Sequence, residues 1–383
     1  MDNSSASPGA PPQLTPPPLI TPPPTRLRRS WGWIIVSIVL LVLLAFSLLG
    51  NFAQALSLAV GGFGSGLNRG FKNNSTRMAG PRLDEFILED NGGRAKIAVI
   101  SVDGIIASTP TPSGNSLVDV MQAQLDRAAE DKRVKAVILK VDSPGGEVMA
   151  SDQINKAIVK FQADSGKPVV CSMGSLAASG GYYVSAPCRW IVANDLTITG
   201  SIGVIMHGYN YRGLMDKVGV LPMTYKSGKY KDMLSPDRST NEIPEGERAM
   251  VQALIDETYG RFTNIVSTGR AQAHQKNGQE GKALADNWAS FADGRVLSGS
   301  QALKLGFVDQ LGDFNEAVIR TKTIAHIAGE ANIVEYRERY DIADFLSMFG
   351  QSGSAHDVKL DLGLDIPKLR AGCMYFLWQA PEN

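Results

Sequence analysis

Cysteine is scarce in this sequence. Cys171, Cys188 and Cys373 are the only three among 383 residues, too few and too scattered for a disulfide framework or a zinc site. At least one of three thiols stays outside any intramolecular disulfide. We expect Cys171 and Cys188 to be buried free thiols, although a bond between them stays open, and we expect neither a metal nor a cofactor.

An excess of charge is also absent, because 38 lysines and arginines balance 38 aspartates and glutamates. Proteins that bind nucleic acid usually carry a strongly basic surface. The G-x-x-x-x-G-K-[ST] loop that cradles nucleotide phosphates is missing as well. We therefore expect no nucleic-acid partner and no ATP-driven step.

Histidine, the usual base of a catalytic triad, occurs four times, as His207, His274, His326 and His356. Only His207 lies near a core-like segment, directly after residues 199–206. A triad based on histidine would therefore have to use His207.

The N-terminal region is predicted to hold a membrane anchor. Residues 1–30 are rich in proline and form a disordered cytoplasmic tail, or else a ligand for aromatic grooves. Residues 31–50 are almost wholly apolar, and about 20 such residues span a bilayer core of about 30 Å. Arginines precede this stretch, so the positive-inside rule places everything after Asn51 on the far side. Ala53-Gln54-Ala55 resembles a cleavage site, but the apolar stretch is longer than that of an ordinary signal peptide.

The remaining chain is predicted to be one α/β domain. Residues 51–93 read as a glycine-rich linker and approach segment, residues 94–345 as the domain and residues 346–383 as a C-terminal extension without a clear pattern. Within the domain, strand-like runs at 96–102, 137–141 and 168–173 alternate with helical spacing at 117–125 and 149–161. Such alternation predicts parallel strands, with the chemistry in the loops after their carboxyl ends.

Two of these loops contain candidate catalytic groups. After Val141 the sequence reads DSPGG, whose glycines leave backbone N–H groups free to bind an oxyanion, although an ordinary turn fits equally well. After Met173 it reads GSLAASGGYY, which places Ser179 where a helix begins and leaves the Gly180 N–H available to an oxyanion. Tight packing of a glycine- and alanine-rich helix start is the structural alternative.

A serine nucleophile needs a base, and a lysine cluster follows. The segment YKSGKYKDM contains Lys226, Lys229 and Lys231. A lysine acts as a base near neutral pH only if its pKa falls from about 10.4 to about 7.5, which requires a dry pocket with hydroxyl partners. Ser201 is a candidate for such a partner, and an exposed lysine cluster without catalytic role is the alternative.

Taken together, these segments resemble the signal peptide peptidase A family, which is related to ClpP-like peptidases and crotonases. DSPGG at 142–146, GSLAASGGYY at 174–183, TGSIGV at 199–204, YKSGKYKDM at 225–233 and DGRVLSGSQALKLGFVD at 293–309 occur in the family's order. The resemblance covers residues 97–312 and implies a ClpP/crotonase-like spiral of repeated β-β-α units behind an N-terminal transmembrane helix.

The same resemblance implies a serine endopeptidase with a Ser-Lys dyad. Ser179 matches the nucleophile, Lys231 the general base and Ser201 the hydroxyl that orients the lysine amine, while Gly146 and Gly180 match the oxyanion donors. It also implies a homo-oligomer whose active sites lie between protomers, and a bacterial inner-membrane location with the domain on the extracytoplasmic side. The implied substrates are remnant signal peptides and other unfolded, apolar peptides.

Two rival interpretations remain. A crotonase-like acyl-CoA enzyme would use paired backbone N–H groups on a thioester, but export argues against coenzyme A chemistry. A catalytically inactive membrane scaffold of the same fold would have no use for Ser179, Ser201 and Lys231 together.

Overall fold

The computed structural model describes residues 36–44, 47, 80–110, 114–339 and 374–377, and the chain divides into two units, residues 1–77 and 78–383. In the first unit, residues 36–44 and 47 are helical and exposed. Within the described parts of the chain, no helix is long and apolar enough to cross a membrane. The predicted anchor at 31–50 lies only partly among these residues, and the predicted tail at 1–30 lies wholly outside them.

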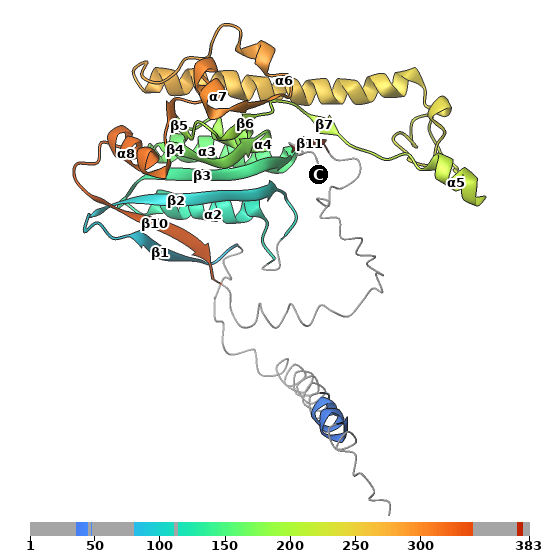
Figure 1. The fold of residues 1–383 in the computed structure, drawn as a ribbon, viewed down its shortest axis with the longest axis horizontal. Coiled ribbons are helices and arrows are strands. Elements are labelled where there is room, and N and C mark those ends of the chain that lie inside the picture. Colours follow the sequence, from blue (N-terminus) through green and yellow to red (C-terminus); the bar gives the residue numbers. More distant parts are fainter. Residues whose placement is uncertain (1–35, 45–46, 48–79, 111–113, 340–373, 378–383) are drawn as a thin grey trace, which may run out of the picture. The chain divides into compact units, whose positions relative to one another are not determined.

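The second unit is built from strands and helices that largely alternate along the chain (Figure 1). The strands are β1 Leu83–Glu89, β2 Ala95–Ile106, β3 Val134–Glu147, β4 Val169–Ala178, β5 Trp190–Ala193, β6 Ile198–Gly200, β7 Ile205–Met206, β8 Val296–Ser298, β9 Gln310–Leu311, β10 Ala331–Glu338 and β11 Met374–Leu377. The α-helices are α2 Leu117–Glu130, α3 Val148–Ser165, α4 Gly180–Ser185, α5 Arg212–Val218, α6 Glu245–Lys276, α7 Gly299–Leu305 and α8 Phe314–Ile324. The predicted strands and helices at 96–173 are confirmed.

The sheet is parallel through its centre. Its main path runs β1-β10-β2-β3-β4-β5-β9, and only β1 pairs antiparallel with its neighbour on this path. Parallel neighbours require a crossover, and α2 and α3 supply it between β2, β3 and β4. The carboxyl ends of these strands consequently meet at one edge of the sheet.

The long strands each consist of two segments. The register of β2 against β3 shifts between Asp103 and Ile105, and that of β3 against β4 shifts between Val141 and Ser143. The first part of β4 pairs with β5, whereas its last three residues pair with β6. Two strand segments followed by a helix therefore recur three times, which is the expected β-β-α repeat.

Consecutive strand residues point to opposite faces of the sheet, and both faces are buried. Ile100, Leu139 and Cys171 lie side by side on the face that packs against α2, α3 and α4. Val99 and Ile138 lie on the other face, where α8 covers them. This explains why the strands read as continuous apolar runs rather than as alternating ones.

The sheet extends beyond the predicted domain at both ends. β1, within the predicted linker 51–93, pairs with β10, so the sheet begins ahead of the predicted start at residue 94. β11, in the extension at 346–383, pairs with both β3 and β7. Cys171 and Cys188 are buried free thiols as expected, and Cys373 lies outside the described residues.

A buried ion pair ties α6 to the edge of the sheet. Arg270 of α6 is paired with Asp309, and both side chains are almost completely buried. Asp309 also accepts the backbone N–H of Ile191 at 2.8 Å, and Arg270 donates to the Cys188 carbonyl at 3.0 Å. The pair thus joins α6 to β5 and to the segment that enters β9.

Replacing Arg270 with methionine should lower the free energy of unfolding by about 3–5 kcal/mol, because the Asp309 carboxylate would stay buried without its partner. Urea unfolding of the whole chain measures this. Lys160→Met is the matched control, since its pair with Asp164 is exposed, and it should leave unfolding unchanged. Equal effects of the two substitutions would contradict a structural role for the buried pair.

Candidate active site

Ser179 lies at the junction between β4 and α4. Its own N–H donates to the Gly200 carbonyl at 2.8 Å, and its carbonyl accepts the N–H of Tyr183 at 2.8 Å. Its backbone has φ 55° and ψ −114°, a conformation that residues other than glycine rarely adopt. The fold therefore holds this serine in a strained turn at the carboxyl end of a central strand, which is typical of a functional position.

Ser201 shares a cavity with Ser179. β6 pairs with the end of β4, with Ala178 opposite Gly200, which places Ser201 beside the nucleophile candidate. Both serines line a cavity of about 490 Å³, which also has apolar and aromatic walls from β7, α6 and β11: Ile205, Ile255, Tyr259 and Leu377. The cavity therefore combines two hydroxyl groups with apolar surface.

Gly146 and Gly180, whose N–H groups are the predicted donors to an oxyanion, also lie close together. A side-chain carbon on Gly180 would lie 3.1 Å from the Gly146 nitrogen, and one on Gly145 would lie 2.5 Å from the Gly180 nitrogen. Gly145 has φ 99°, in the region that favours glycine. The backbones of DSPGG and of the α4 start are thus in direct contact beside Ser179, and only glycine permits this approach.

A polar network joins α4 to helices α3 and α6. Asp152 of α3 accepts hydrogen bonds from the Tyr183 hydroxyl at 2.8 Å and from Arg261 of α6 at 2.6 Å, and it pairs with Lys156. Burial raises the pKa of Asp152, but these three donors outweigh it, so the pKa lies below its usual value. Burial raises the pKa of Tyr183, which keeps its hydroxyl protonated as a donor.

Lys231 is not brought to the serine within one chain. It lies exposed in the loop between α5 and α6 and does not line the cavity of Ser179. Figure 1 shows α5 beyond the N-terminal end of α6, away from the sheet. Ser179, Ser201, Gly146 and Gly180 therefore form one half of the predicted site, and Lys231 is separate from them.

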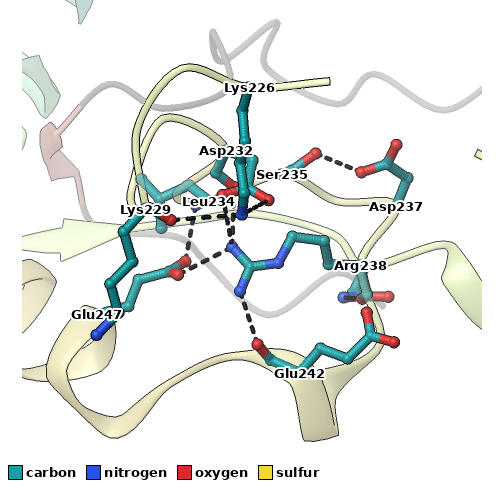
Figure 2. A network of polar contacts seen from close by, with 10 residues as sticks. Lys226, Lys229, Asp232, Leu234, Ser235, Asp237, Arg238, Glu242 and Glu247 are labelled. Atoms are coloured by element: carbon teal, nitrogen blue, oxygen red, sulfur yellow. Dashed lines mark hydrogen bonds and ion pairs between the residues drawn. The ribbon is translucent and has the colours of Figure 1, made fainter. Parts of the chain in front are cut away.

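The three lysines differ in their surroundings. Lys226 pairs with Asp232 at 2.7 Å, as Figure 2 shows, and Lys229 lies over the Tyr230 ring at 5.0 Å. The exposed Lys231 ammonium forms no hydrogen bond or ion pair within the described part of the chain. Of the three, Lys231 is thus the one available to another group.

His207 does not enter the site. It is exposed after β7, close to the Tyr209 ring, and is not part of the cavity wall. A triad based on His207 and Ser179 is therefore not formed within the chain.

Sequence reasoning missed the contribution of β11. Tyr375 lies opposite Glu147, Phe376 opposite Gly146 and Leu377 opposite Gly145, while Met374 and Tyr375 also pair with β7. Phe376 is buried and stacks on Tyr183, with ring centroids 4.8 Å apart. The run MYFL has the aromatic composition of a short strand, but nothing in the sequence indicates where it pairs.

Comparison with known proteins identifies relatives of this chain. The model of Peptidase family S49 matches residues 161–328. A putative signal peptide peptidase of Enterococcus faecium is 37% identical over 259 residues, which is 67% of this chain and 71% of that protein. A putative protease of Synechocystis sp. is 42% identical over 232 residues, which is 61% of this chain and 75% of that protein.

Among solved structures, a mutant of the 1510-N membrane-bound stomatin-specific protease in complex with a substrate peptide is 19% identical. The match has a TM-score of 0.36 and covers 67% of this chain and 97% of that one.

Strain at residue 179 can be measured. Ser179→Gly should be more stable than Ser179→Ala by about 1 kcal/mol, because glycine adopts the φ of 55° without the strain that a side chain incurs. Urea unfolding of the two variants tests this, since both lack the hydroxyl. An alanine variant as stable as the glycine variant would show that the turn is not strained.

Proposed function

The chain belongs to peptidase family S49 and is a serine peptidase of the signal peptide peptidase A family, and on this premise we propose that it is an endopeptidase with a Ser-Lys dyad. Ser179 is the nucleophile, Lys231 of a neighbouring copy is the general base and Ser201 orients the lysine amine. The family membership favours peptide hydrolysis over acyl-CoA chemistry.

The proposed reaction is acyl transfer in two steps. The neutral amine of Lys231 takes the proton of the Ser179 hydroxyl while its oxygen attacks the peptide carbonyl. The N–H groups of Gly146 and Gly180 stabilise the negative charge on the carbonyl oxygen. The lysine ammonium then gives its proton to the departing amine, and a water molecule, deprotonated by the same lysine, releases the acyl group from the serine.

The position of β11 is the observation that supports a peptide substrate. β11 is an extended segment of four residues that pairs antiparallel with β3 on one side and with β7 on the other. Its last residue lines the cavity that contains Ser179. Main-chain pairing of this kind accepts an extended peptide largely irrespective of its sequence, and folded proteins do not present such a segment. An unfolded substrate therefore fits beside the serine as β11 does.

A neighbouring copy as the source of the lysine is supported by helix α6. Glu247, at its start, contacts the loop that carries Lys231, whereas Tyr259 lines the cavity of Ser179. Tyr259 is 12 positions from Glu247, about 18 Å along the helix axis, and Ile255, which also lines the cavity, is 8 positions from it, about 12 Å. One chain thus carries both halves of the site, held apart by a rigid helix.

The segment around α5 supplies a surface for that copy. Apolar and aromatic side chains are exposed along it: Leu214, Val218, Leu221, Met223 and Tyr225. All five lie within residues 214–225, and exposed apolar side chains that gather in one region are typical of an interaction site. We place it against the neighbouring copy that receives Lys231.

The proposed setting is the extracytoplasmic side of a bacterial inner membrane, with residues 31–50 as the anchor. The apolar sequence of that segment and the arginines before it support this orientation. The proposed substrates are remnant signal peptides and other unfolded, apolar peptides.

Ser179→Ala and Lys231→Ala should each lower hydrolysis of a fluorogenic apolar peptide by at least about 10³-fold at matched oligomeric state. Lys229→Ala is the matched control and should retain turnover within a few-fold, because the Lys229 ammonium lies over the Tyr230 ring and not in the contacts of Asp232 and Glu247. Oligomers co-assembled from the two inactive variants should regain up to about a quarter of the activity, since random mixing gives that share of sites with both groups. Full activity in Lys231→Ala would discard the dyad, and no recovery on mixing would place both groups on one chain.

Deleting residues 374–383 should lower KM for peptide substrates at least about five-fold, because β11 no longer competes for the edges of β3 and β7. Deleting residues 378–383 alone, which leaves β11 in place, is the control. Steady-state kinetics of both variants with the same peptide measure the change in KM. An unchanged KM after the longer deletion would mean that peptides bind elsewhere.

A further inference from the structure

The loop that carries Lys231 is attached to helix α6 by a group of charged side chains, of which Glu247 is buried. Glu247, in the first turn of α6, is only 3% exposed, although it is a carboxylate. Buried charges are costly unless they are paired, so a glutamate buried in the first turn of a helix requires partners. Figure 2 shows its two partners, which both belong to the segment that precedes α6.

The first partner is the guanidinium of Arg238. It donates to Glu247 Oε2 at 2.9 Å, to the Glu242 carbonyl at 2.8 Å and to the Asp232 carbonyl at 3.1 Å. Asp232 is the residue directly after Lys231. A planar guanidinium binds several acceptors in fixed directions, so Arg238 fixes the backbone beside the lysine relative to α6.

The second partner is the N–H of Leu234, which donates to Glu247 Oε1 at 3.1 Å. Leu234 has φ 64°, a left-handed conformation that is unfavourable for a leucine. The carboxylate therefore holds the loop in a turn that the chain would otherwise leave. Two turns precede it, in which the N–H of Lys231 donates to Gly228 and that of Met233 to Tyr230.

Asp232 binds one of the three lysines of this loop. Its carboxylate binds Lys226 at 2.7 Å and lies 3.4 Å from Arg238. Lys226 is thus paired, whereas the Lys231 side chain is exposed, as expected for a group offered to another copy.

We propose that Glu247 and Arg238 form a clamp that positions Lys231 for the serine of a neighbouring copy. This inference rests on the proposed function. Neither residue touches the reacting atoms; both are positioning residues, and they act by fixing the loop at 228–236 to the N-terminal turn of α6. Because the same helix lines the Ser179 cavity further along, the clamp sets where the lysine lies relative to the assembled sites.

Glu247→Gln keeps the shape of the side chain but removes the charge that Arg238 binds. We expect kcat to fall by about 10- to 100-fold with KM changed less than about two-fold, since a displaced base affects the reaction and not peptide binding. The acidic limb of the kcat/KM profile should move to higher pH, because a lysine placed less firmly against the serines of the neighbouring copy is less shielded from water and stays protonated to higher pH. Arg238→Lys keeps the charge but loses the planar guanidinium that binds several acceptors at once, and it should give a smaller effect in the same direction.

Glu245→Gln is the matched control, because it removes an exposed carboxylate from the same helical turn. It should leave kcat, KM and the pH profile unchanged. Hydrogen–deuterium exchange of the oligomer provides a readout that does not depend on turnover: exchange at 228–236 should increase in Glu247→Gln and not in Glu245→Gln.

The outcomes separate this inference from the function on which it rests. Wild-type kcat and pH profile in Glu247→Gln, together with an inactive Lys231→Ala, would overturn the clamp and leave the dyad intact. Unchanged exchange at 228–236 would overturn it as well. An active Lys231→Ala would instead refute the dyad and, with it, any role of the clamp in positioning a base.

Discussion

The contact between the DSPGG loop and the start of α4 is the constraint on which the site depends. Gly145, Gly146 and Gly180 approach so closely that no side-chain carbon fits at any of them. A carbon on Gly146 would lie 1.9 Å from the Ile106 carbonyl, so the loop is confined from the sheet side as well. This confinement brings two backbone N–H groups next to one serine.

The surrounding structure maintains this contact from several directions. β6 fixes the Ser179 backbone through Gly200, and Asp152 holds α4 through the Tyr183 hydroxyl. Arg261, near the middle of α6, joins the same carboxylate to this helix, so the long helix is tied to the turn that contains Ser179. At its N-terminal end α6 holds the Lys231 loop through Glu247. A single helix therefore relates both halves of the proposed dyad, which fits an enzyme assembled from several copies.

The regular part of the fold could be predicted from sequence because its signals are local. Strands buried on both faces appear as apolar runs, and α2 has a capping box at Ser116 and Asp119 with helical spacing of its buried residues. β1 and β11 were not predicted. Both pair with partners more than 200 residues away along the chain, Leu83 with Glu338 and Tyr375 with Glu147, and short strands of this kind owe their form to tertiary pairing.

The sequence by itself determined which residues are candidates for the chemistry: Ser179, Ser201 and the glycines stand in loops after strand ends, and parallel strands bring such loops together. Only the tertiary structure decided how they are arranged. It showed that Lys231 lies apart from Ser179 in its own chain, that β11 pairs with β3 beside Ser179, and that Glu247 is buried against the lysine loop. These features depend on packing between distant segments, and no local pattern of residues encodes the distance between them.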